Sequence, residues 1–490
     1  MVTLLPAERL INAILGLSIA IFITGLLLVG FVIGRRVKRD RDFDLLARFR
    51  EQARAILRGL VDHAFEYEEA LGRLQKLIQP RYLRAMEQIL IEESANPGFE
   101  VPLRRLAEDL GFIRIWQNRV QLLHRRESGG PVRFLVNAVR RIHFLQFFAA
   151  ARSAENLGRI RHHKSWELLV RALHHPHRDV QAVALRSLAS IGEPQSFPAL
   201  VRQLRVAVET QKPKLSEHAL KLALSRFPLN VAGQQLPLFQ DSNPRLRILA
   251  LNILRGMLAR EAARQKRLLS EADLGFDLFH GAFSQLVQDN NADARAAVAD
   301  VLTFLEEEHA EQALLTLLQD GEWFVRLHAL RALGERKNGD FVPLLAKQLT
   351  DSHWRVREAA AHALIYCGHP GREQLLKSFL STKDLYAQEQ IAEELQISGL
   401  ISELMERCGE KGARQELEVV RKMIKIGKTS RIEALLCEQI DPRRRQIILS
   451  ELARDPASQV QIWVNRLNER CEMVQVGAHR HEEACGAFID

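Results

Sequence analysis

The sequence repeats itself at a fixed spacing, and this period limits the folds that the chain can adopt. The segment that begins at Asp320 and the segment that begins at Asp351 match at an offset of 31 residues (351 − 320). The matching pairs are Asp320/Asp351, Trp323/Trp354, Val325/Val356 and Arg326/Arg357. Self-similarity at a period of about 20–50 residues is typical of repeat architectures. We therefore expect one long array of small units, although 490 residues would suffice for about three average domains.

An aspartate followed six residues later by an arginine recurs earlier in the chain. The arginines of the four copies lie at 247, 295, 326 and 357, and weaker copies extend the period over about 165–455. Each unit is expected to hold two short helices, with the aspartate at the start of the second helix, where a carboxylate accepts backbone N–H groups. Residues three and seven positions after the arginine then share one helical face and bury it against neighbouring units. No strand-type alternation persists, so the predicted fold class is all-α.

Because of these residues the chain resembles HEAT-repeat proteins. Its short unit is similar to the phycobilisome-lyase type of HEAT-like repeat, and the chain as a whole resembles a membrane-anchored bacterial HEAT-repeat protein. The resemblance implies an α-solenoid in which aspartates and arginines of adjacent units form a ladder. The residues that carry the resemblance are Asp241, Arg247, Asp289, Arg295, Asp320, Arg326, Asp351 and Arg357. Because an active site occurs once and a structural ladder repeats, we interpret these pairs as structural. HEAT arrays serve many functions, so the fold does not select one.

A second feature is an apolar run near the N-terminus. Residues 10–33 carry no charge over 24 positions, and as a helix they would span roughly 36 Å, against a hydrocarbon core of about 30 Å. The run is longer than the core of a signal peptide, and basic residues follow it instead of preceding it. We therefore predict an uncleaved transmembrane helix over 10–33.

Five basic residues follow the run directly: Arg35, Arg36, Lys38, Arg39 and Arg41. Basic residues are retained on the cytoplasmic side, so they predict a single-pass protein of the inner membrane with its N-terminus outside and its solenoid in the cytosol. They also predict contact with anionic lipid headgroups. The cysteines at 367, 408, 437, 471 and 485 form an odd set without a C-x-x-C pair, and unpaired thiols suit a reducing cytosol.

The predicted domain order follows from these features and from turn residues. An exterior N-terminus covers 1–9, the transmembrane helix 10–33, a basic flank and helical neck 34–127, the HEAT-like solenoid 132–470, and a tail 471–490. The boundary near 128 rests on the Gly- and Pro-containing stretch 127–131.

No motif predicts a catalytic, cofactor-binding or metal site, and no cofactor is expected. Histidines cluster at His162, His163, His174, His175 and His177, and the tail holds His479, His481, Glu482, Glu483 and Cys485. We interpret the first group as loop and cap residues, because they flank a helix and no Cys or repeated His-Glu pair accompanies them. The residue types of the second group suit Zn or Fe, but the tail is short and terminal, so we expect no metal site there. The chain has no G-x-S-x-G motif, and the sequence before Gly427 lacks the first glycine of a phosphate loop.

One basic stretch is a candidate for binding a partner. Residues near 258–277 look like an insertion, because the repeat offset grows there from 31 to 48 (295 − 247), and insertions in solenoids map to one face. The candidates are Arg260, Arg264, Lys266 and Arg267. A solvated helical face is the alternative interpretation, and no aromatic residues are interleaved for stacking on bases.

Two functions remain. The favoured one is a membrane-anchored cytosolic scaffold or adaptor without enzyme activity, which binds a membrane-associated protein at the inner membrane face and assists envelope or polysaccharide machinery. The alternative is a HEAT-fold nucleic-acid-binding or DNA-repair enzyme resembling alkylpurine DNA glycosylases, which the basic pI near 9.4 suggests. Those enzymes line one cleft with tryptophan and aspartate. Here Trp323 and Trp354 occupy equivalent repeat positions, which indicates packing, so a nucleic-acid partner is not favoured.

Overall fold

The computed structural model is all-α in its described part. It describes the backbone of residues 7–96, 98–125, 136–175, 177–210, 213–270, 273, 282–306, 308–408 and 413–470. Side chains are described from residue 22 onward, apart from 122–146. Within these ranges the β pairing consists of an isolated bridge between Leu269 and Leu305. The chain divides into two compact units, one ending at Phe227 and one beginning at Pro228.

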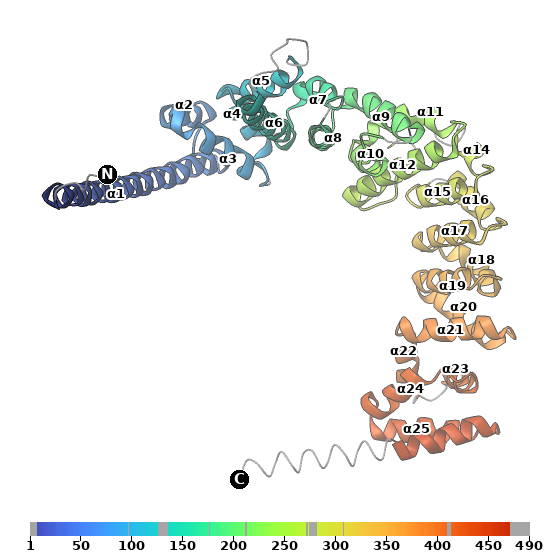
Figure 1. Cartoon of the computed structure of the whole chain (residues 1–490). Helices are drawn as coiled ribbons and strands as arrows, with labels where there is room; N and C mark the ends of the chain where they lie inside the picture. The colour runs from blue at the N-terminus through green and yellow to red at the C-terminus, as the bar shows by residue number, and fades with distance from the viewer. Residues whose placement is uncertain are drawn as a thin grey trace, which may run out of the picture. The chain divides into compact units, whose positions relative to one another are not determined.

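The expected transmembrane helix requires correction. Residues 10–33 belong to α1 (Ala7–Val61), a single helix of 55 residues that continues through the basic flank (Figure 1). A search of the described residues finds no helix whose length and apolar character would let it cross a membrane. The side chains of residues 10–21 lie outside the described part. The apolar run is thus not a separate segment but one end of a helix whose other half is charged.

Because no such transmembrane helix is found, the predicted location is also wrong. A single-pass inner-membrane protein with its N-terminus outside and its solenoid in the cytosol has no support without a membrane span. The cysteine argument also weakens: Cys367 and Cys408 are free and buried, but Cys437 is disulfide-bonded. The tail 471–490 and the stretch 127–131 lie outside the described residues, so the boundaries placed there stay predictions.

The first unit begins with a helical cluster around the C-terminal half of α1. Phe49, Ala53, Leu57 and Leu60 recur at helical spacing and are buried, and this face packs on two of the following helices, α2 and α3. The elements of this part are α1, α2 (Tyr67–Leu77), α3 (Leu83–Glu93), α4 (Glu100–Asp109), α5 (Phe112–Arg125) and α6 (Val136–Arg159).

A buried carboxylate ties three helices of this cluster together. Oε1 of Glu87 on α3 accepts hydrogen bonds from Trp116 Nε1 on α5 at 2.8 Å and from Asn156 Nδ2 on α6 at 2.7 Å. Arg119 Nη1 lies 3.5 Å from the same oxygen. These donors offset the cost of burying the charge.

Helix pairs of the repeat type complete the first unit. They are α7 (Trp166–Ala172) with α8 (Arg178–Ile191) and α9 (Phe197–Glu209) with α10 (Glu217–Leu224). At Gly158 of α6 an added Cβ would lie 2.6 Å from the Ser187 Cα of α8, so a residue without a side chain is required for this close approach.

The second unit is a stack of helix pairs. Its described helices are α11 (Leu236–Phe239), α12 (Pro244–Gln265), α14 (Ser284–Leu286), α15 (Ala292–Leu302), α16 (Glu308–Leu317), α17 (Trp323–Glu335), α18 (Val342–Lys347), α19 (Trp354–Tyr366), α20 (Gly368–Ser381), α21 (Leu385–Ile397), α22 (Leu400–Arg407), α23 (Arg414–Lys425), α24 (Ser430–Ala434), α25 (Pro442–Leu452) and a helix over 458–470. The second helices of consecutive pairs contact one another in the order α12, α15, α17, α19, α21 (Figure 1).

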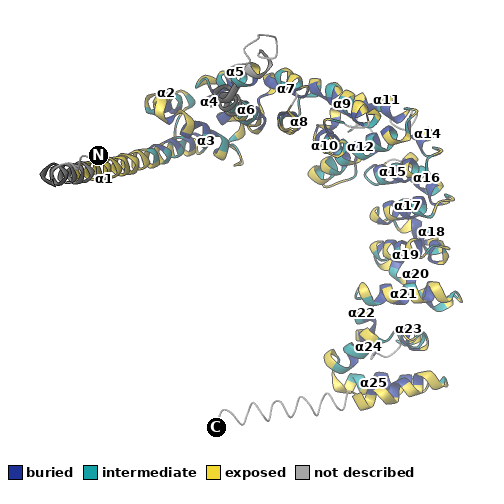
Figure 2. Cartoon of the chain, viewed as in Figure 1, coloured by how far each residue is buried: buried dark blue, intermediate teal, exposed yellow. Residues whose placement is uncertain are grey.

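Small residues set the spacing of this stack. Ala359, Ala360 and Ala363 of α19 are buried, and an added Cβ on Gly334 of α17 would lie only 2.7 Å from the Cβ of Ala363. The two helices therefore touch nearly backbone to backbone at this point. Figure 2 shows the resulting pattern, in which each helix of the stack has a buried and an exposed side.

Candidate functional site

The repeated aspartates and arginines meet across neighbouring units. Arg247, Arg295 and Arg326 each form a bidentate pair with the aspartate of the next unit. Nε and Nη2 of Arg247 donate to Asp289 at 2.7 and 2.7 Å. The same atoms of Arg295 donate to Asp320 at 2.6 and 2.9 Å, and those of Arg326 donate to Asp351 at 2.8 and 2.8 Å. We call this row the ladder.

Each ladder residue also holds its own loop. In each of the four copies the aspartate Oδ1 accepts the N–H of the residue two positions on, at 2.8–2.9 Å. In each copy the arginine Nη1 donates to the carbonyl oxygen of the aspartate six positions earlier, at 2.7–2.8 Å. Burial alone raises the pKa of the Asp351 carboxyl, but the hydrogen bonds from Arg326 and from the His353 N–H outweigh it, and the pKa lies below its usual range. The ladder thus fixes loops and spacing.

The ladder ends at Arg357. The position 31 residues after Asp351 (351 + 31) is Thr382, which has no carboxylate to offer. Arg357 still donates to the Asp351 carbonyl, but its buried Nε has no hydrogen-bond partner, and its guanidinium lies 5.6 Å from the ring centroid of Tyr386. In the described part of the chain no carboxylate pairs with Arg357, which is 9% exposed, whereas each of the three preceding arginines has one.

Aromatic side chains, together with Arg355 and Leu385, surround this end of the ladder; Trp323 and His353 are half-buried and the others are exposed. They occupy the first turns of α17, α19 and α21 together with the residue before α19, and we call them the tryptophan edge: Trp323, His353, Trp354, Arg355, Leu385 and Tyr386. The rings of Trp323 and His353 stack at 3.8 Å with an interplanar angle of 7°. Trp354 is 49% exposed, Leu385 66% and Tyr386 69%. Trp323 thus packs against a neighbouring unit, as expected for the tryptophans, whereas Trp354 does not.

The charge of the tryptophan edge is mainly positive. The Arg355 guanidinium lies 5.7 Å from the ring centroid of Trp323 and 5.2 Å from that of Trp354, within the range of cation–π attraction. Lys383 is exposed nearby, and Glu322 is an exposed carboxylate on the same edge. Asp384 is a second carboxylate on this edge: it accepts the Tyr386 N–H at 2.9 Å and the Ala387 N–H at 3.4 Å, and so offsets the positive dipole end of α21.

The basic candidates in the insertion are largely occupied within the fold. Arg264 is hydrogen-bonded to Glu261, and Arg267 forms a bidentate pair with Asp273 at 2.8 and 2.8 Å. Lys266 is the left-handed residue that ends α12, with φ +55, and it is exposed, as is Arg260. Their role as a partner-binding group stays a prediction.

The other predicted groups lie apart from one another. The basic flank residues Arg35, Arg36, Lys38, Arg39 and Arg41 are exposed along α1. Among the histidines, Nδ1 of His162 lies 2.8 Å from the Ser165 hydroxyl, and Nδ1 of His175 accepts the His177 N–H at 3.1 Å. Burial lowers the pKa of His162. These are local contacts at turns.

Sequence reasoning missed two glutamines that take the arginine's place. Gln388 lies 31 residues after Arg357 and donates to the Thr382 carbonyl at 2.7 Å, and Gln181 donates likewise to the His175 carbonyl. The offset alone could have found Gln388. The exposure of Leu385 and Tyr386 was also missed, although both lie one period after Trp354 and Arg355.

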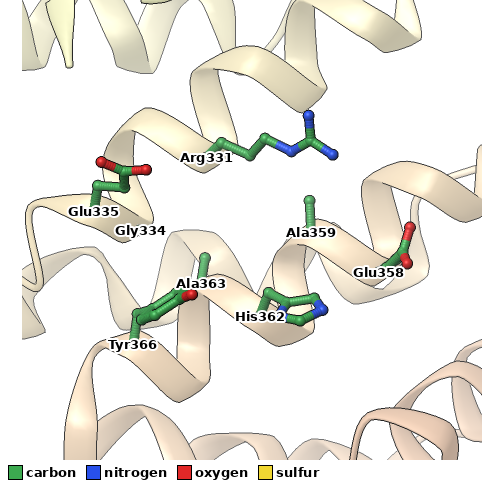
Figure 3. Close-up of a pocket in the computed structure, with 8 residues that line it drawn as sticks. All are labelled: Arg331, Gly334, Glu335, Glu358, Ala359, His362, Ala363 and Tyr366. Atoms are coloured by element: carbon green, nitrogen blue, oxygen red, sulfur yellow. The ribbon is translucent and has the colours of Figure 1, made fainter. Parts of the chain in front are cut away.

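A cavity of about 290 Å³ lies between α17 and α19, away from the tryptophan edge. Figure 3 shows Arg331 and Glu335 on one helix and Glu358, His362 and Tyr366 on the other. Glu358 and His362 also meet Glu394 of α21, and the ligand atoms of these three residues lie within 4.8 Å of one another. Among the described residues this group has the chemistry to hold a metal ion.

Sequence comparison identifies the repeats. The family described as HEAT repeats matches residues 149–212 and 281–365, so HEAT repeats are present in both units. Nothing in the match singles out the phycobilisome-lyase type or a membrane-anchored protein. No curated protein matches the chain in sequence.

Solved structures match the chain at low sequence identity and with TM-scores below 0.5. An engineered protein is 17% identical, covers 73% of this chain and 98% of its own, and has a TM-score of 0.29. A karyopherin bound to a SUMO protease is 15% identical, with coverage of 84% and 49% and a TM-score of 0.40. YibA of Escherichia coli is 16% identical, with coverage of 56% and 96% and a TM-score of 0.32. The chain thus spans about half the karyopherin.

Proposed function

We propose that this HEAT-repeat protein is a scaffold that binds a partner protein at the tryptophan edge. The observation that carries the proposal is the exposure of Trp354, Leu385 and Tyr386 beside a buried arginine that lacks a carboxylate. Large apolar side chains exposed together favour an interaction site over a solvated surface. Tryptophan, tyrosine and arginine are also the residues in which interface hot spots are enriched.

The charges of the edge select the chemistry of the partner. Arg355, Lys383 and Arg357 outnumber the carboxylates Glu322 and Asp384, and this excess favours a negative segment. The exposed rings favour an apolar or aromatic anchor. The proposed partner therefore presents an acidic segment with at least one large apolar side chain. One carboxylate of the partner pairs with Arg357, where the chain itself has Thr382 and not an aspartate.

Peptide selection on the immobilised full chain tests the proposal. A random peptide library should yield segments that combine Asp or Glu with Trp, Phe or Leu, and the selected peptides should bind less well as salt rises. Trp354→Ala and Tyr386→Ala should weaken binding of a selected peptide by about 2 kcal/mol or more each, as hot-spot truncations do.

Thr382→Asp is the sharper variant. It supplies the carboxylate missing from the ladder, so it should neutralise Arg357 and weaken acidic peptides without disturbing the fold. Tyr366→Ala is the matched control, because Tyr366 is an exposed tyrosine at the other end of α19. Selection of basic peptides, tighter binding of single-stranded nucleic acid than of any peptide, or equal losses in Tyr366→Ala and Tyr386→Ala would each overturn the proposal.

The earlier expectation of a membrane tether is not part of this proposal. The idea that the partner belongs to envelope or polysaccharide machinery depended on the membrane helix and is withdrawn with it. The repair-enzyme alternative needs tryptophan and aspartate together in one cleft. Here Asp320 and Asp351 are engaged by ladder arginines, so that alternative is supported by the basic pI near 9.4 and not by these residues.

A further inference from the structure

Three side chains with metal-binding chemistry meet on the stack of second helices, outside the tryptophan edge. Glu358 and His362 lie four residues apart on α19, so both project from the same face of that helix. Glu394 reaches them from α21, which packs on α19. His362 Nε2 lies 3.1 Å from Glu394 Oε2, and the ligand atoms of all three residues lie within 4.8 Å of one another.

Glu394 departs from the repeat pattern at a position where the stack needs a small residue. One and two periods earlier the equivalent residues are Ala363 and Ala332 (394 − 31 and 363 − 31), and both are buried at helix contacts. The repeat architecture therefore accounts for an alanine there and gives no reason for a carboxylate.

The buried carboxylate is also incompletely satisfied. Glu394 is 1% exposed, and its Oε2 has no hydrogen-bond partner, because the close contact with His362 lacks hydrogen-bond geometry. Burial raises the pKa of Glu394, and its effect exceeds the opposing effect of His362. A buried acceptor left in this way costs free energy unless a cation or donor completes it.

We propose that Glu358, His362 and Glu394 bind a divalent transition-metal ion of the Zn²⁺ class. One imidazole and two carboxylates are ligands that Zn²⁺ accepts, and three protein ligands leave a fourth position for water. That position faces solvent, because the His362 side chain is 47% exposed. Ligand atoms at about 2.1 Å from a tetrahedral ion lie about 3.4 Å apart, so the three side chains, whose ligand atoms lie within 4.8 Å of one another, must draw closer on binding.

A second residue supports the carboxylate from outside the site. The Gln390 side chain, one turn earlier on α21, acts on the Glu394 carboxylate and opposes the rise of its pKa. Such outer partners hold metal ligands in orientation and are typical of built metal sites. Bound metal would link α19 to α21 and stabilise this part of the stack.

Metal titration of the full chain tests the site. Protein stripped with a chelator is titrated with Co²⁺, whose visible absorption reports ligation, and with Zn²⁺ in competition with a chromophoric chelator. One equivalent should bind, and His362→Gln and Glu394→Gln should each weaken Zn²⁺ by about tenfold or more. Zn²⁺ should raise the melting temperature of the wild-type chain and not that of either variant.

Matched variants separate this site from others. His369→Gln on α20 and Glu389→Gln on α21 remove an exposed histidine and an exposed carboxylate nearby and should leave the affinity unchanged. Absence of a bound equivalent would overturn the proposal. So would binding unaffected by His362→Gln and Glu394→Gln, including binding that disappears only when His479 and His481 of the tail are replaced. The peptide experiments on the tryptophan edge are independent of either result.

Discussion

At the scale of residues, the ladder decides how well each repeat is held. Arg326 pairs with Asp351 of the next unit and also closes the loop of its own unit through the Asp320 carbonyl, with its side chain only 14% exposed. One guanidinium therefore donates to both carboxylate oxygens of Asp351 and to the carbonyl oxygens of Asp320 and Gly321, so its loss would leave several polar groups short of a partner.

Removal of one ladder arginine should lower the stability of the fold strongly. Arg326→Ala leaves Asp351 as an uncompensated, largely buried charge, so the free energy of unfolding should fall by about 3–5 kcal/mol. Arg331→Ala, an exposed arginine on the same helix, should change it by less than about 0.5 kcal/mol. Urea unfolding followed by circular dichroism measures both, and similar effects of the two substitutions would contradict the structural role of the ladder.

Completion of the ladder at position 382 should instead raise the free energy of unfolding. In Thr382→Asp the new carboxylate can accept the Asp384 N–H, as the Thr382 hydroxyl does now at 3.2 Å, and can pair with Arg357. A hydrogen bond to a charged group contributes about 1.5–3 kcal/mol, so the variant should unfold at higher urea than the wild type. A destabilised variant would show that Arg357 does not lack a counter-charge.

The ladder also predicts a dependence on pH. The pKa of Asp320 and that of Asp351 lie below their usual value; burial opposes this, and hydrogen bonds from arginine and backbone outweigh it. A depressed folded-state pKa gives stability that is present above the unfolded pKa of about 3.9 and lost as pH falls through the folded pKa. The stability difference between the wild type and Asp351→Asn should therefore be full at pH 7 and shrink below about pH 4. A constant difference would be inconsistent with the pairing.

At the scale of elements, the contact between α17 and α19 depends on one glycine. Gly334→Ala places a Cβ 2.7 Å from that of Ala363 and 2.9 Å from its Cα, so the helices must move apart at a cost of about 1–3 kcal/mol. Gly72→Ala in α2 adds a Cβ with nothing within 4 Å and should instead stabilise by about 1 kcal/mol. Thermal unfolding of both variants tests the contrast, which fails if the two substitutions shift the melting temperature in the same direction.

How far the sequence predicts these elements depends on whether a feature repeats. The Asp-x5-Arg spacing was visible because it recurs, and the structure pairs those residues. Glu394 could not be recognised, because it occurs once and its partners lie a period away. The exposure of Tyr386 was hidden for a physical reason: a packed aromatic residue and an exposed one look alike without the neighbouring helix. The apolar run of α1 was misjudged because hydropathy describes a segment and not the helix that contains it.

At the scale of the whole molecule, the tryptophan edge and the proposed metal site of Glu358, His362 and Glu394 belong to the second unit. Both lie on the second helices of the stack, the edge at their first turns and the proposed metal site further along α19 and α21. Side chains of successive repeats thus combine into surfaces that no single repeat provides, which is how repeat proteins build binding surfaces. The central claim is that one of these surfaces, the tryptophan edge, holds a partner protein.

Site-specific photocrosslinking in cells measures this most directly. A photoreactive phenylalanine analogue is placed at Leu385 or Tyr386 on the edge. The control positions are two exposed residues away from it, Ile397 at the other end of α21 and Tyr366 at the end of the neighbouring helix α19. The account predicts one and the same polypeptide attached at both edge positions through an acidic segment, lost on Thr382→Asp, and absent from Tyr366 and Ile397. The same product at all four positions, or crosslinks at Tyr366 and Ile397 alone, would contradict it.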